Sequence, residues 1–310
     1  MSLAFLYAGQ GTQHPGMGAD LYQAFPTFRA AVDAAQVDFD LKTVMFSDPD
    51  GVLNETQYTQ PCMVAFAAGL TAVLAEQGIT PDYAAGLSLG EYSALTCAGV
   101  FTAPQAVSLA AFRGRAMAEA AAGRPCGMTA VLGLEREKLA AACAQAQAEG
   151  LGVAEIANYN CPGQLVIGGE QPAVDRAAAL AREAGARRCL PLKVSGPFHT
   201  SLLAPAGDAL RARFAAEPFG EMCIPVLFNC LGREMGPGDT VPALLERQVQ
   251  SSVYMEDTIR RLAELGVDAI VEIGPGRALS GFVKKTAPEI KTYAVETVAD
   301  VDALAAALKG

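Results

Sequence analysis

Residues 83–98, YAAGLSLGEYSALTCA, carry the strongest structural signal in the chain. Tyr83–Leu87 is short and apolar and predicts a buried strand, whereas Leu89–Ala98 has the spacing of a helix. Between them, the pattern G-x-S-x-G places Ser88 on a tight turn from strand to helix, which is the context of a nucleophile elbow. The N–H of Leu89 would then lie at a helix N-terminus, where it can stabilise an oxyanion. The alternative is a glycine-lined helix start in which Ser88 only packs.

The alternation of strand and helix continues on both sides of this stretch. Before it, Leu3–Tyr7 predicts a buried strand, and Phe25–Phe39 and Thr59–Gln77 predict helices. After it, Pro104–Ala122 predicts a further helix that is rich in alanine. Strands that alternate with helices indicate an α/β fold with a mainly parallel sheet.

Residues 124–192 have a different order of elements, βαββαβ, which is typical of a ferredoxin-like α+β unit. We expect a small domain there, inserted into a large catalytic α/β domain made of residues 1–123 and 193–310. The strands expected in the small domain are Cys126–Gly133, Val153–Asn160, Gln164–Gly169 and Arg187–Lys193, with helices Glu135–Ala148 and Gln171–Ala184. Further strands are expected at Val226–Asn229 and Ala269–Ile273, with helices Thr200–Ala216, Val241–Gln250, Met255–Leu265, Arg277–Lys285 and 300–308.

The composition argues against several classes of protein. The chain has 310 residues, a formal net charge of −10, 51% hydrophobic residues and 18% charged residues, so it is not intrinsically disordered. The acidic balance, without any run of more than two basic residues, argues against binding to nucleic acid. The N-terminal MSLAFLYAGQG lacks the basic region of a signal peptide, and we find no apolar stretch of about 20 residues that predicts a membrane span.

The cysteines and histidines do not have the spacing of a metal site. Eight cysteines form no C-x-x-C pair, and the only histidines are His14 and His199, so we expect no zinc site. The cysteines lie mostly in apolar runs, which indicates buried thiols in a reducing, cytoplasmic compartment.

A serine nucleophile needs a base, and the two histidines are the candidates. His14 lies in a loop next to Pro15, whereas His199 lies in SGPFHT, residues 195–200, after the inserted unit. In ordinary α/β hydrolases the histidine comes late in the chain, so the position of His199 fits that order poorly. A backbone carbonyl is an alternative to the carboxylate that usually orients the imidazole.

Two further features bear on the chemistry of a pocket. Arg113 lies on the helix Pro104–Ala122, and its guanidinium would suit an acyl group with a free carboxylate if it faced the pocket. The alternative is a solvated surface arginine, which we expect for Arg115. The loop Gly9-Gln10-Gly11 follows the first strand and is either a source of a second oxyanion N–H or a plain tight turn.

Seven segments together resemble one family, the malonyl-CoA:acyl carrier protein transacylases of fatty-acid synthesis. They follow the family's order across nearly the whole chain, so they are specific as a set although each alone is weak. The segments are GQGTQ at 9–13, TQPC at 59–62, GLSLGEYSAL at 86–95, FRGRAM at 112–117, NYNCPGQLVIGG at 158–169, SGPFHTSLL at 195–203 and EIGPGRAL at 272–279. The resemblance implies a hydrolase-like α/β domain with a ferredoxin-like insertion. Two departures are Leu87, where many members have histidine, and Ala8, where proline is common.

The resemblance implies a role for each matching residue. Ser88 resembles the acylated nucleophile, His199 its base and Arg113 the residue that binds the malonyl carboxylate. The other implied residues are Gln10 and Leu89, whose N–H groups would form the oxyanion hole, Gln248, whose main-chain carbonyl would orient the histidine, and Asn160 in the pocket. As a separate hypothesis, we expect Phe198 to crowd a 2-methyl group and so favour malonyl over methylmalonyl.

The implied activity is ping-pong transfer of a malonyl group from malonyl-CoA to the phosphopantetheine thiol of acyl carrier protein, through a malonyl-serine. The family expectation is a monomer that needs no metal or redox cofactor. Because the carrier protein is acidic, its docking would require a basic surface on this chain. The alternative is that the basic residues are ordinary solvated charges. The candidates are Arg182, Arg187, Arg188, Lys284 and Lys285.

Three other functions stay open on the sequence alone. A serine esterase or thioesterase would share Ser88 and His199 but would have no use for Arg113. A non-catalytic module would bind the carrier protein without forming an acyl-enzyme. A trans-acting acyltransferase of polyketide assembly would differ only in its carrier partner.

Overall fold

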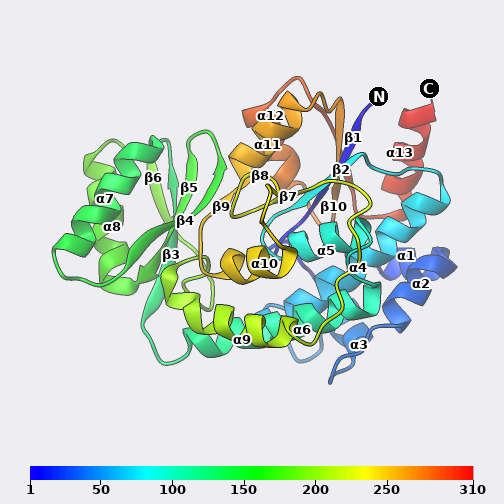
Figure 1. The fold of residues 1–310 in the computed structure, drawn as a ribbon, viewed down its shortest axis with the longest axis horizontal. Coiled ribbons are helices and arrows are strands. Elements are labelled where there is room, and N and C mark those ends of the chain that lie inside the picture. Colours follow the sequence, from blue (N-terminus) through cyan, green and yellow to red (C-terminus); the bar gives the residue numbers. More distant parts are fainter. Residues whose placement is uncertain (310) are drawn as a thin grey trace.

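Two β-sheets organise residues 1–309, which the computed structural model describes (Figure 1). The larger sheet has six strands in the order β11-β10-β1-β2-β7-β8, parallel throughout except for the antiparallel pair β7 and β8. Its strands are β1 (Leu3–Tyr7), β2 (Tyr83–Gly86), β7 (Val226–Phe228), β8 (Arg233–Glu234), β10 (Ala269–Ile273) and β11 (Lys291–Val295). All residues of β1 and β10 are buried, as expected for parallel strands with helices on both faces. The predicted α/β class is confirmed.

Helices cover both faces of the six-stranded sheet. Phe5 and Tyr7 of β1 pack into one apolar cluster together with α4, whereas Ala4 and Leu6 pack into another cluster together with α11 and α12. The helices around this sheet are α1 (Ala19–Ala24), α2 (Pro26–Asp33), α3 (Leu41–Phe46), α4 (Thr56–Glu76), α5 (Gly90–Cys97), α6 (Ala103–Ala121), α9 (Ala204–Phe214), α10 (Val241–Val249), α11 (Met255–Glu264), α12 (Ala278–Thr286) and α13 (Val298–Lys309).

The helix predicted over Phe25–Phe39 is present but ends earlier than expected. The helix α2 begins at Pro26, whose missing N–H is not needed at a first helical position. It ends at Asp33, and no helix covers the stretch from there to Asp40, the N-cap of α3. Phe39 continues the helical spacing of apolar residues in the sequence, but it belongs to an irregular segment. Its ring packs against Tyr58, with ring centroids 4.9 Å apart, which accounts for an apolar residue outside the helix.

The helix α4 is longer and more apolar than expected, because we predicted no apolar stretch of about 20 residues. Among the described residues it is the one helix long and apolar enough to cross a membrane, but 78% of its most apolar window is buried inside the molecule. Val64, Phe66 and Leu70 of this helix are completely buried in the main core. Its apolar composition is therefore accounted for by packing between the sheet and the neighbouring helices.

The second sheet is the predicted ferredoxin-like unit, with its elements in the order βαββαβ. Its strand order is β6-β3-β5-β4, antiparallel throughout, and β9 adds a fifth, parallel strand beside β4. Val131, Ile167 and Val174 are completely buried in a separate apolar cluster between this sheet and its helices. The elements are β3 (Cys126–Leu132), α7 (Arg136–Ala148), β4 (Ala154–Cys161), β5 (Gln164–Glu170), α8 (Gln171–Glu183), β6 (Arg188–Pro191) and β9 (Val253–Tyr254).

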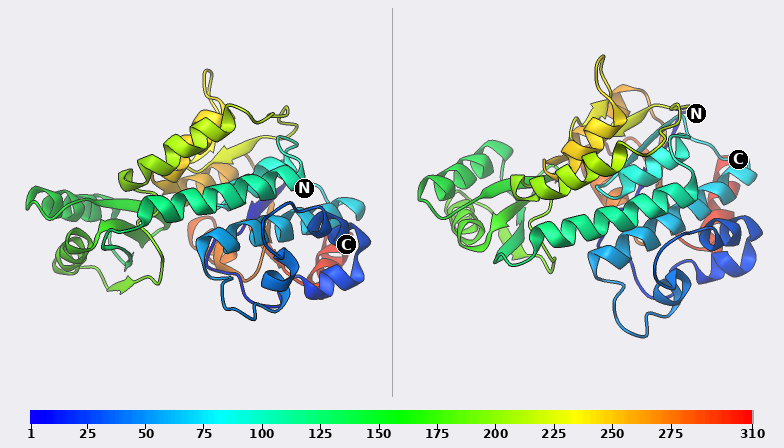
Figure 2. Two further views of the ribbon diagram at one scale, coloured as in Figure 1. Left: turned by 90° about the horizontal axis from the view of Figure 1, so that it is seen from below. Right: turned by 60° about the horizontal axis from the view of Figure 1, so that its bottom comes forward.

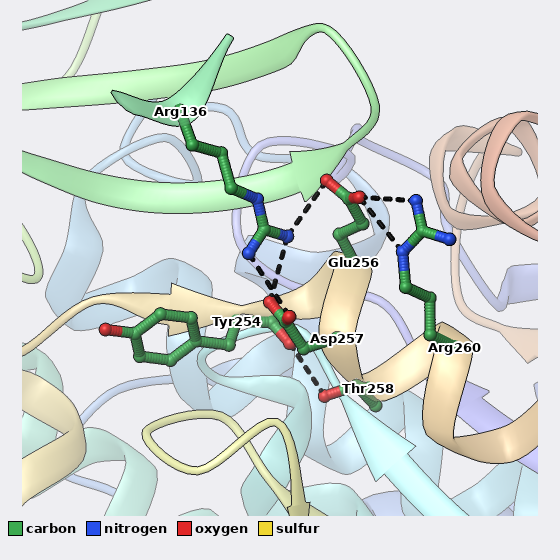
Figure 3. Close-up of polar contacts among 6 residues, drawn as sticks. All are labelled: Arg136, Tyr254, Glu256, Asp257, Thr258 and Arg260. Atoms are coloured by element: carbon green, nitrogen blue, oxygen red, sulfur yellow. Dashed lines mark hydrogen bonds and ion pairs between the residues drawn. The ribbon is translucent and has the colours of Figure 1, made fainter. Parts of the chain in front are cut away.

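The two sheets are joined by more than the chain itself. The strand β9 comes from the segment just before α11, outside residues 124–192, and pairs Val253 with Asn158 of β4. Beside it, the guanidinium of Arg136 on α7 lies 2.9 Å from a carboxylate oxygen of Glu256 and 2.9 Å from one of Asp257, both on α11 (Figure 3). The long helix α6 leads into β3, so it connects the two parts of the molecule (Figure 2).

The cysteines are free thiols, and five of the eight are buried as expected: Cys62, Cys143, Cys161, Cys189 and Cys230. Cys223 is exposed, contrary to the expectation of buried thiols. It lies in the irregular segment before β7, where its backbone N–H and its thiol both donate to the main-chain oxygen of Ala98.

Candidate active site

Ser88 lies on the turn between β2 and α5 with a left-handed backbone, φ 53°. This conformation costs a residue other than glycine roughly 1–2 kcal/mol, so the surroundings must hold the turn in place. Both glycines of the motif are required by space. A Cβ at Gly86 would collide with the main-chain carbonyl of Gly90, and a Cβ at Gly90 would collide with the carbonyl oxygen of Tyr7. The strained turn places Ser88 at the wall of a pocket.

His199 meets Ser88 although 111 residues separate them in the chain. Its Nε2 lies 2.6 Å from Ser88 Oγ, and its Nδ1 lies 2.9 Å from the main-chain oxygen of Gln248. A carbonyl can only accept a hydrogen bond, so Nδ1 carries the proton and Nε2 is left as the acceptor for the serine hydroxyl. The carbonyl of Gln248 therefore occupies the place that a carboxylate has in a Ser-His-Asp triad.

The environment of His199 keeps its imidazole neutral. The side chain is buried, and this burial, together with the nearby charge of Arg113, lowers the pKa of His199 to about 4. Both causes act against the protonated form. At neutral pH the imidazole is therefore free to accept a proton, which is what a general base must do.

Arg113 is a fully buried cation that faces the serine. Its Nη2 lies 3.1 Å from Ser88 Oγ and 3.0 Å from Gln248 Oε1, and its Nη1 lies 2.9 Å from Gln60 Oε1. The salt bridges of residues 1–309 include none to this guanidinium, whose partners are neutral oxygens. Because a buried charge without a counter-ion is costly, the site is suited to an anionic ligand. The neighbouring Arg115 lies at the surface and pairs with Asp38, as expected.

The loop after β1 packs directly on the serine turn. A Cβ at Gly9 would lie 2.6 Å from the carbonyl oxygen of Leu87, so glycine allows the close approach. Among the described residues, no hydrogen bond uses the N–H of Gln10 or the N–H of Leu89. Two unengaged backbone donors therefore lie on the two segments that meet at Ser88.

The pocket lies between the two sheets and has a volume of about 580 Å³. Ser88, His199 and Arg113 supply its reactive wall, and apolar and amide side chains from both parts of the chain surround them. The lining includes Gln10, Leu87, Met117 and Phe198 from the six-stranded part and Met128, Asn158, Asn160 and Val166 from the five-stranded part. Asn160 Oδ1 is buried and has no hydrogen-bond partner in residues 1–309. Of the predicted site residues, Leu89 and Gln248 lie behind this lining.

The other histidine and the basic candidates lie elsewhere. His14 is half-exposed and pairs with Glu296, 2.5 Å from its Nε2, and it does not line the pocket. The five basic residues considered for docking, Arg182, Arg187, Arg188, Lys284 and Lys285, are all exposed.

Sequence reasoning missed two buried polar residues at this site, Gln60 and Asn229, and the role of the Gln248 side chain. Gln60 on α4 binds Arg113, the amide of Gln248 donates to the main-chain oxygen of Ser88 at 2.7 Å, and Asn229 holds the serine turn. The polar residues at the start of α4, Gln60 among them, were an available signal, because buried polar side chains need partners. Asn229 follows a parallel strand, at the sheet edge where α/β sites form, which was a second signal.

A serine hydroxyl, a neutral imidazole and a buried cation at one end of a pocket can bring about acyl transfer, with the cation selecting an acyl group that carries a negative charge. Fold and site together define an acyltransferase. Comparison with known proteins agrees, since the family model of the acyl transferase domain matches residues 4–302.

The most informative relatives cover nearly the whole chain. The malonyl CoA-acyl carrier protein transacylase of Bacillus subtilis is 38% identical over 295 residues, 94% of this chain and 93% of the relative. A solved structure described as MCAT from Streptococcus pneumoniae is 43% identical, with a TM-score of 0.93 and 99% and 100% of the two chains covered. Another similar structure is described as a type II PKS acyl-carrier protein in complex with its malonyl-transacylase. The matched chain of that structure is 36% identical to this one, with a TM-score of 0.94 and with 99% of this chain and 100% of that chain covered.

The chain belongs to the acyl transferase domain family and, within it, to the malonyl CoA-acyl carrier protein transacylases.

Proposed function

We propose that this chain transfers a malonyl group from malonyl-CoA to the phosphopantetheine thiol of an acyl carrier protein, through a malonyl ester of Ser88, and so supplies fatty-acid synthesis. The observation that carries the proposal is the buried guanidinium of Arg113, which lies 3.1 Å from Ser88 Oγ and forms no salt bridge among the described residues. A terminal carboxylate on the acyl group would supply that missing charge.

The first half-reaction forms the acyl-enzyme. Nε2 of His199 takes the proton of Ser88 Oγ as the oxygen attacks the thioester carbon of malonyl-CoA. The backbone N–H groups of Gln10 and Leu89 hold the oxyanion, a contribution of about 3 kcal/mol for each donor. The C–S bond breaks, the protonated imidazole returns the proton to the sulfur, and CoA leaves as the thiol.

The second half-reaction uses the same groups in reverse. The thiol of the carrier's phosphopantetheine gives its proton to His199 and attacks the ester carbon of malonyl-Ser88. When the tetrahedral intermediate collapses, the proton returns to Ser88 Oγ and the malonyl thioester of the carrier is released. Every step balances with the two substrates and these side chains, so the scheme is ping-pong and contains no cofactor.

Two pocket residues are assigned to substrate selection. Phe198 lies in the wall beside His199, where its ring would crowd a 2-methyl group, so malonyl is favoured over methylmalonyl. Asn160, whose Oδ1 is buried and unpartnered, is suited to accept a hydrogen bond from an amide N–H of the pantetheine arm. Competition between malonyl-CoA and methylmalonyl-CoA in a Phe198→Ala variant tests the first assignment, and KM for malonyl-CoA in an Asn160→Ala variant tests the second.

The partner in this proposal is a holo acyl carrier protein that approaches the pocket mouth between the two sheets. The solved complex of a carrier protein with its malonyl-transacylase supports this type of partner. The exposed Arg187, Arg188, Lys284 and Lys285 would meet an acidic carrier surface. We propose a cytoplasmic monomer, without contact to membrane or nucleic acid.

The decisive experiment is the intact mass of the protein after brief incubation with malonyl-CoA, with Ser88→Ala as the matched control. We expect a gain of one malonyl group on the parent protein alone, and loss of that group when holo carrier protein is added. Parallel reactions with fatty-acid and polyketide carriers identify the preferred partner.

The alternative functions give other results in the same experiment. Steady release of CoA without a covalent gain would indicate a hydrolase. Binding of the carrier with neither a covalent gain nor CoA release would indicate a non-catalytic module. Either result would overturn the proposed transfer.

A further inference from the structure

A buried polar network lies behind Ser88 that no step of the proposed reaction uses. Its members are Glu91 on α5 and Asn229 directly after β7, and both side chains are completely buried. Since β7 is the neighbour of β2 in the large sheet, Asn229 lies beside the turn that carries the serine (Figure 1).

The side chain of Asn229 spans the serine turn with two hydrogen bonds. Its Oδ1 accepts from the backbone N–H of Ser88 at 2.5 Å, and its Nδ2 donates to the main-chain oxygen of Gly86 at 2.6 Å. One amide therefore holds the turn on both sides of Leu87. Asparagine offers this donor and this acceptor together without any change of protonation state.

The backbone of Asn229 is itself held from two directions. Its N–H donates to Oε2 of Glu91 at 2.6 Å, and its main-chain oxygen accepts from the N–H of Tyr254 at 2.9 Å. Glu91 follows Ser88 by three residues on α5, so the contacts close a ring from the serine through the helix to Asn229 and back. The ring leaves the turn few ways to relax.

The ring bears on both parts of the proposed chemistry. Ser88 is one of three residues other than glycine with a positive φ in the described chain, and the Asn229 amide binds the backbone on either side of it. Because the N–H of Ser88 is occupied by Asn229, it cannot serve the oxyanion. The N–H of the next residue, Leu89, is free to bind the oxyanion, and its direction is set by the same turn.

We propose that Asn229 is a positioning residue, which holds the strained turn so that Ser88 Oγ and the N–H of Leu89 face the reacting carbonyl, and that Glu91 acts through Asn229. The expected effect of Asn229 on the rate of malonyl transfer rests on the proposed function. The expected effect on the reactivity of Ser88 does not.

The role of Glu91 requires a hydrogen-bond acceptor rather than a charge. Its Oε2 accepts from the N–H of Asn229, which either protonation state allows. Burial raises the pKa of Glu91 to about 8. The N–H of Asn229, the side chain of Gln248 and the charge of Arg113 act to lower this pKa. A glutamine presents the same carbonyl oxygen at the same length. Glu91→Gln is therefore expected to keep the ring intact, and Glu91→Ala is expected to break it.

The test combines steady-state kinetics with a reagent that needs neither Arg113 nor an acyl donor. Asn229→Asp replaces the donor to Gly86 by an oxygen, so we expect kcat for malonyl transfer to fall by about 100-fold while KM for malonyl-CoA changes by less than about 3-fold. Labelling of Ser88 by a neutral alkyl fluorophosphonate should slow by a similar factor. Glu91→Ala should lower both rates by about 10-fold, and Glu91→Gln should restore them to within about 3-fold of the parent.

Glu272 is the matched control for a loss of stability. It is equally buried, and its carboxylate accepts from the N–H groups of Leu279 and Ser280 at 2.9 and 2.7 Å, at the start of α12. Glu272→Ala should lower resistance to urea without slowing the labelling of Ser88. If Asn229→Asp does not fold, the labelling rate and the resistance to urea of Asn229→Ser and Glu91→Ala are compared with those of Glu272→Ala instead.

Labelling of the Asn229 variants at the parental rate would overturn the proposal, as would an equal loss of labelling in Glu272→Ala. A failure of the proposed function looks different. In that case the parent protein would not gain a malonyl group from malonyl-CoA, yet fluorophosphonate would label Ser88, and the labelling rates of the variants would still decide the role of Asn229.

Discussion

At the scale of single residues, the site depends on two backbones held in an unfavourable conformation. Ser88 and His199 both have positive φ, 53° and 60°, and they are the two partners of the 2.6 Å contact between hydroxyl and imidazole. Strain of this kind persists only where surrounding contacts over-determine it. The rigidity of the two residues, rather than any unusual side-chain chemistry, brings the groups together.

Arg113→Ala should abolish the preference for an acyl group that carries a carboxylate. Loss of a buried, charge-assisted contact costs about 3–5 kcal/mol, so kcat/KM for malonyl-CoA should fall by about 100-fold or more. Transfer from acetyl-CoA should fall much less. Competition between the two donors measures the ratio, and Arg115→Ala, at the surface, is the control. Ester turnover that is unaffected by Arg113→Ala would support a hydrolase instead.

The pH dependence of activity should report the burial of His199. Because burial and the charge of Arg113 lower the pKa of His199 to about 4, kcat/KM should stay high well below pH 6.5 and decline only as the pH approaches that lowered value. Arg113→Met removes a positive charge, so the pKa should rise and the acid limb should move to higher pH. Fluorophosphonate labelling across the pH range gives the profile, while circular dichroism checks that the protein stays folded. An acid limb at the ordinary histidine pKa of about 6.5 in the parent would contradict this environment.

At the scale of elements, the sequence predicts those helices and strands whose own residues show a clear apolar pattern. The predicted strands Leu3–Tyr7 and Ala269–Ile273 coincide with β1 and β10, and other predicted elements, such as the helix Thr59–Gln77, differ by a few residues at their ends. The edge strand β11 was missed because only Val295 of its five residues is buried, so it lacks an apolar run. The strands β8 and β9 were missed because each has only two residues and is defined by its partner, β7 for one and β4 for the other. No two-residue pattern in a sequence can indicate such a strand.

Close packing of α4 on α6 makes Gly114 sensitive to any added atom. A Cβ at Gly114 would lie 2.7 Å from the carbonyl oxygen of Thr56, so Gly114→Ala should lower the free energy of unfolding by about 1–3 kcal/mol. Gly281, inside α12, has open space within 4 Å of where a Cβ would lie, so Gly281→Ala should raise the same quantity by about 0.4–1 kcal/mol. Urea unfolding of the two variants measures both changes. Equal effects in the two would mean that backbone entropy, not crowding, dominates.

At the scale of the whole molecule, the position of the five-stranded sheet determines the shape of the pocket. Asn158, Asn160 and Val166 reach the pocket from this sheet, while Ser88 belongs to the other. The sheet is held on one side by β9 and by the contacts of Arg136 with α11 (Figure 3). The guanidinium of Arg136 also lies 4.7 Å from the centre of the Tyr159 ring. The domain boundaries 1–123, 124–192 and 193–310 stay a prediction, and the contribution of β9 means that the two parts share a sheet.

Arg136→Ala should loosen this connection. It removes two contacts to α11 and leaves Glu256, which is only 8% exposed, with Arg260 as its remaining partner. We expect the free energy of unfolding to fall by about 1–3 kcal/mol and KM for the carrier protein to rise. The control is Arg176→Ala, whose exposed pair with Glu149 lies within the five-stranded part and should contribute little. Urea unfolding and carrier titration measure the two effects, and equal changes in both variants would contradict a role for Arg136 between the sheets.

Local order in this chain follows from the amino-acid pattern. The elbow around Ser88, the parallel α/β core and the βαββαβ insertion are each encoded within a few tens of residues, because strand and helix periodicity and the glycine turns act over short distances. Arg113 and His199 could be named as candidates for the same reason, since their residue types carry the required chemistry.

Proximity, in contrast, was decided by the tertiary structure. Ser88 and His199 are 111 residues apart, Arg113 and Gln248 are 135 apart, and Ser88 and Asn229 are 141 apart, yet each pair is in hydrogen-bond contact. Such contacts depend on the order of strands in the sheet and on how helices pack against it, which no local pattern specifies. The lowered pKa of His199 and the unpaired charge of Arg113 arise only when the folded chain removes water from both.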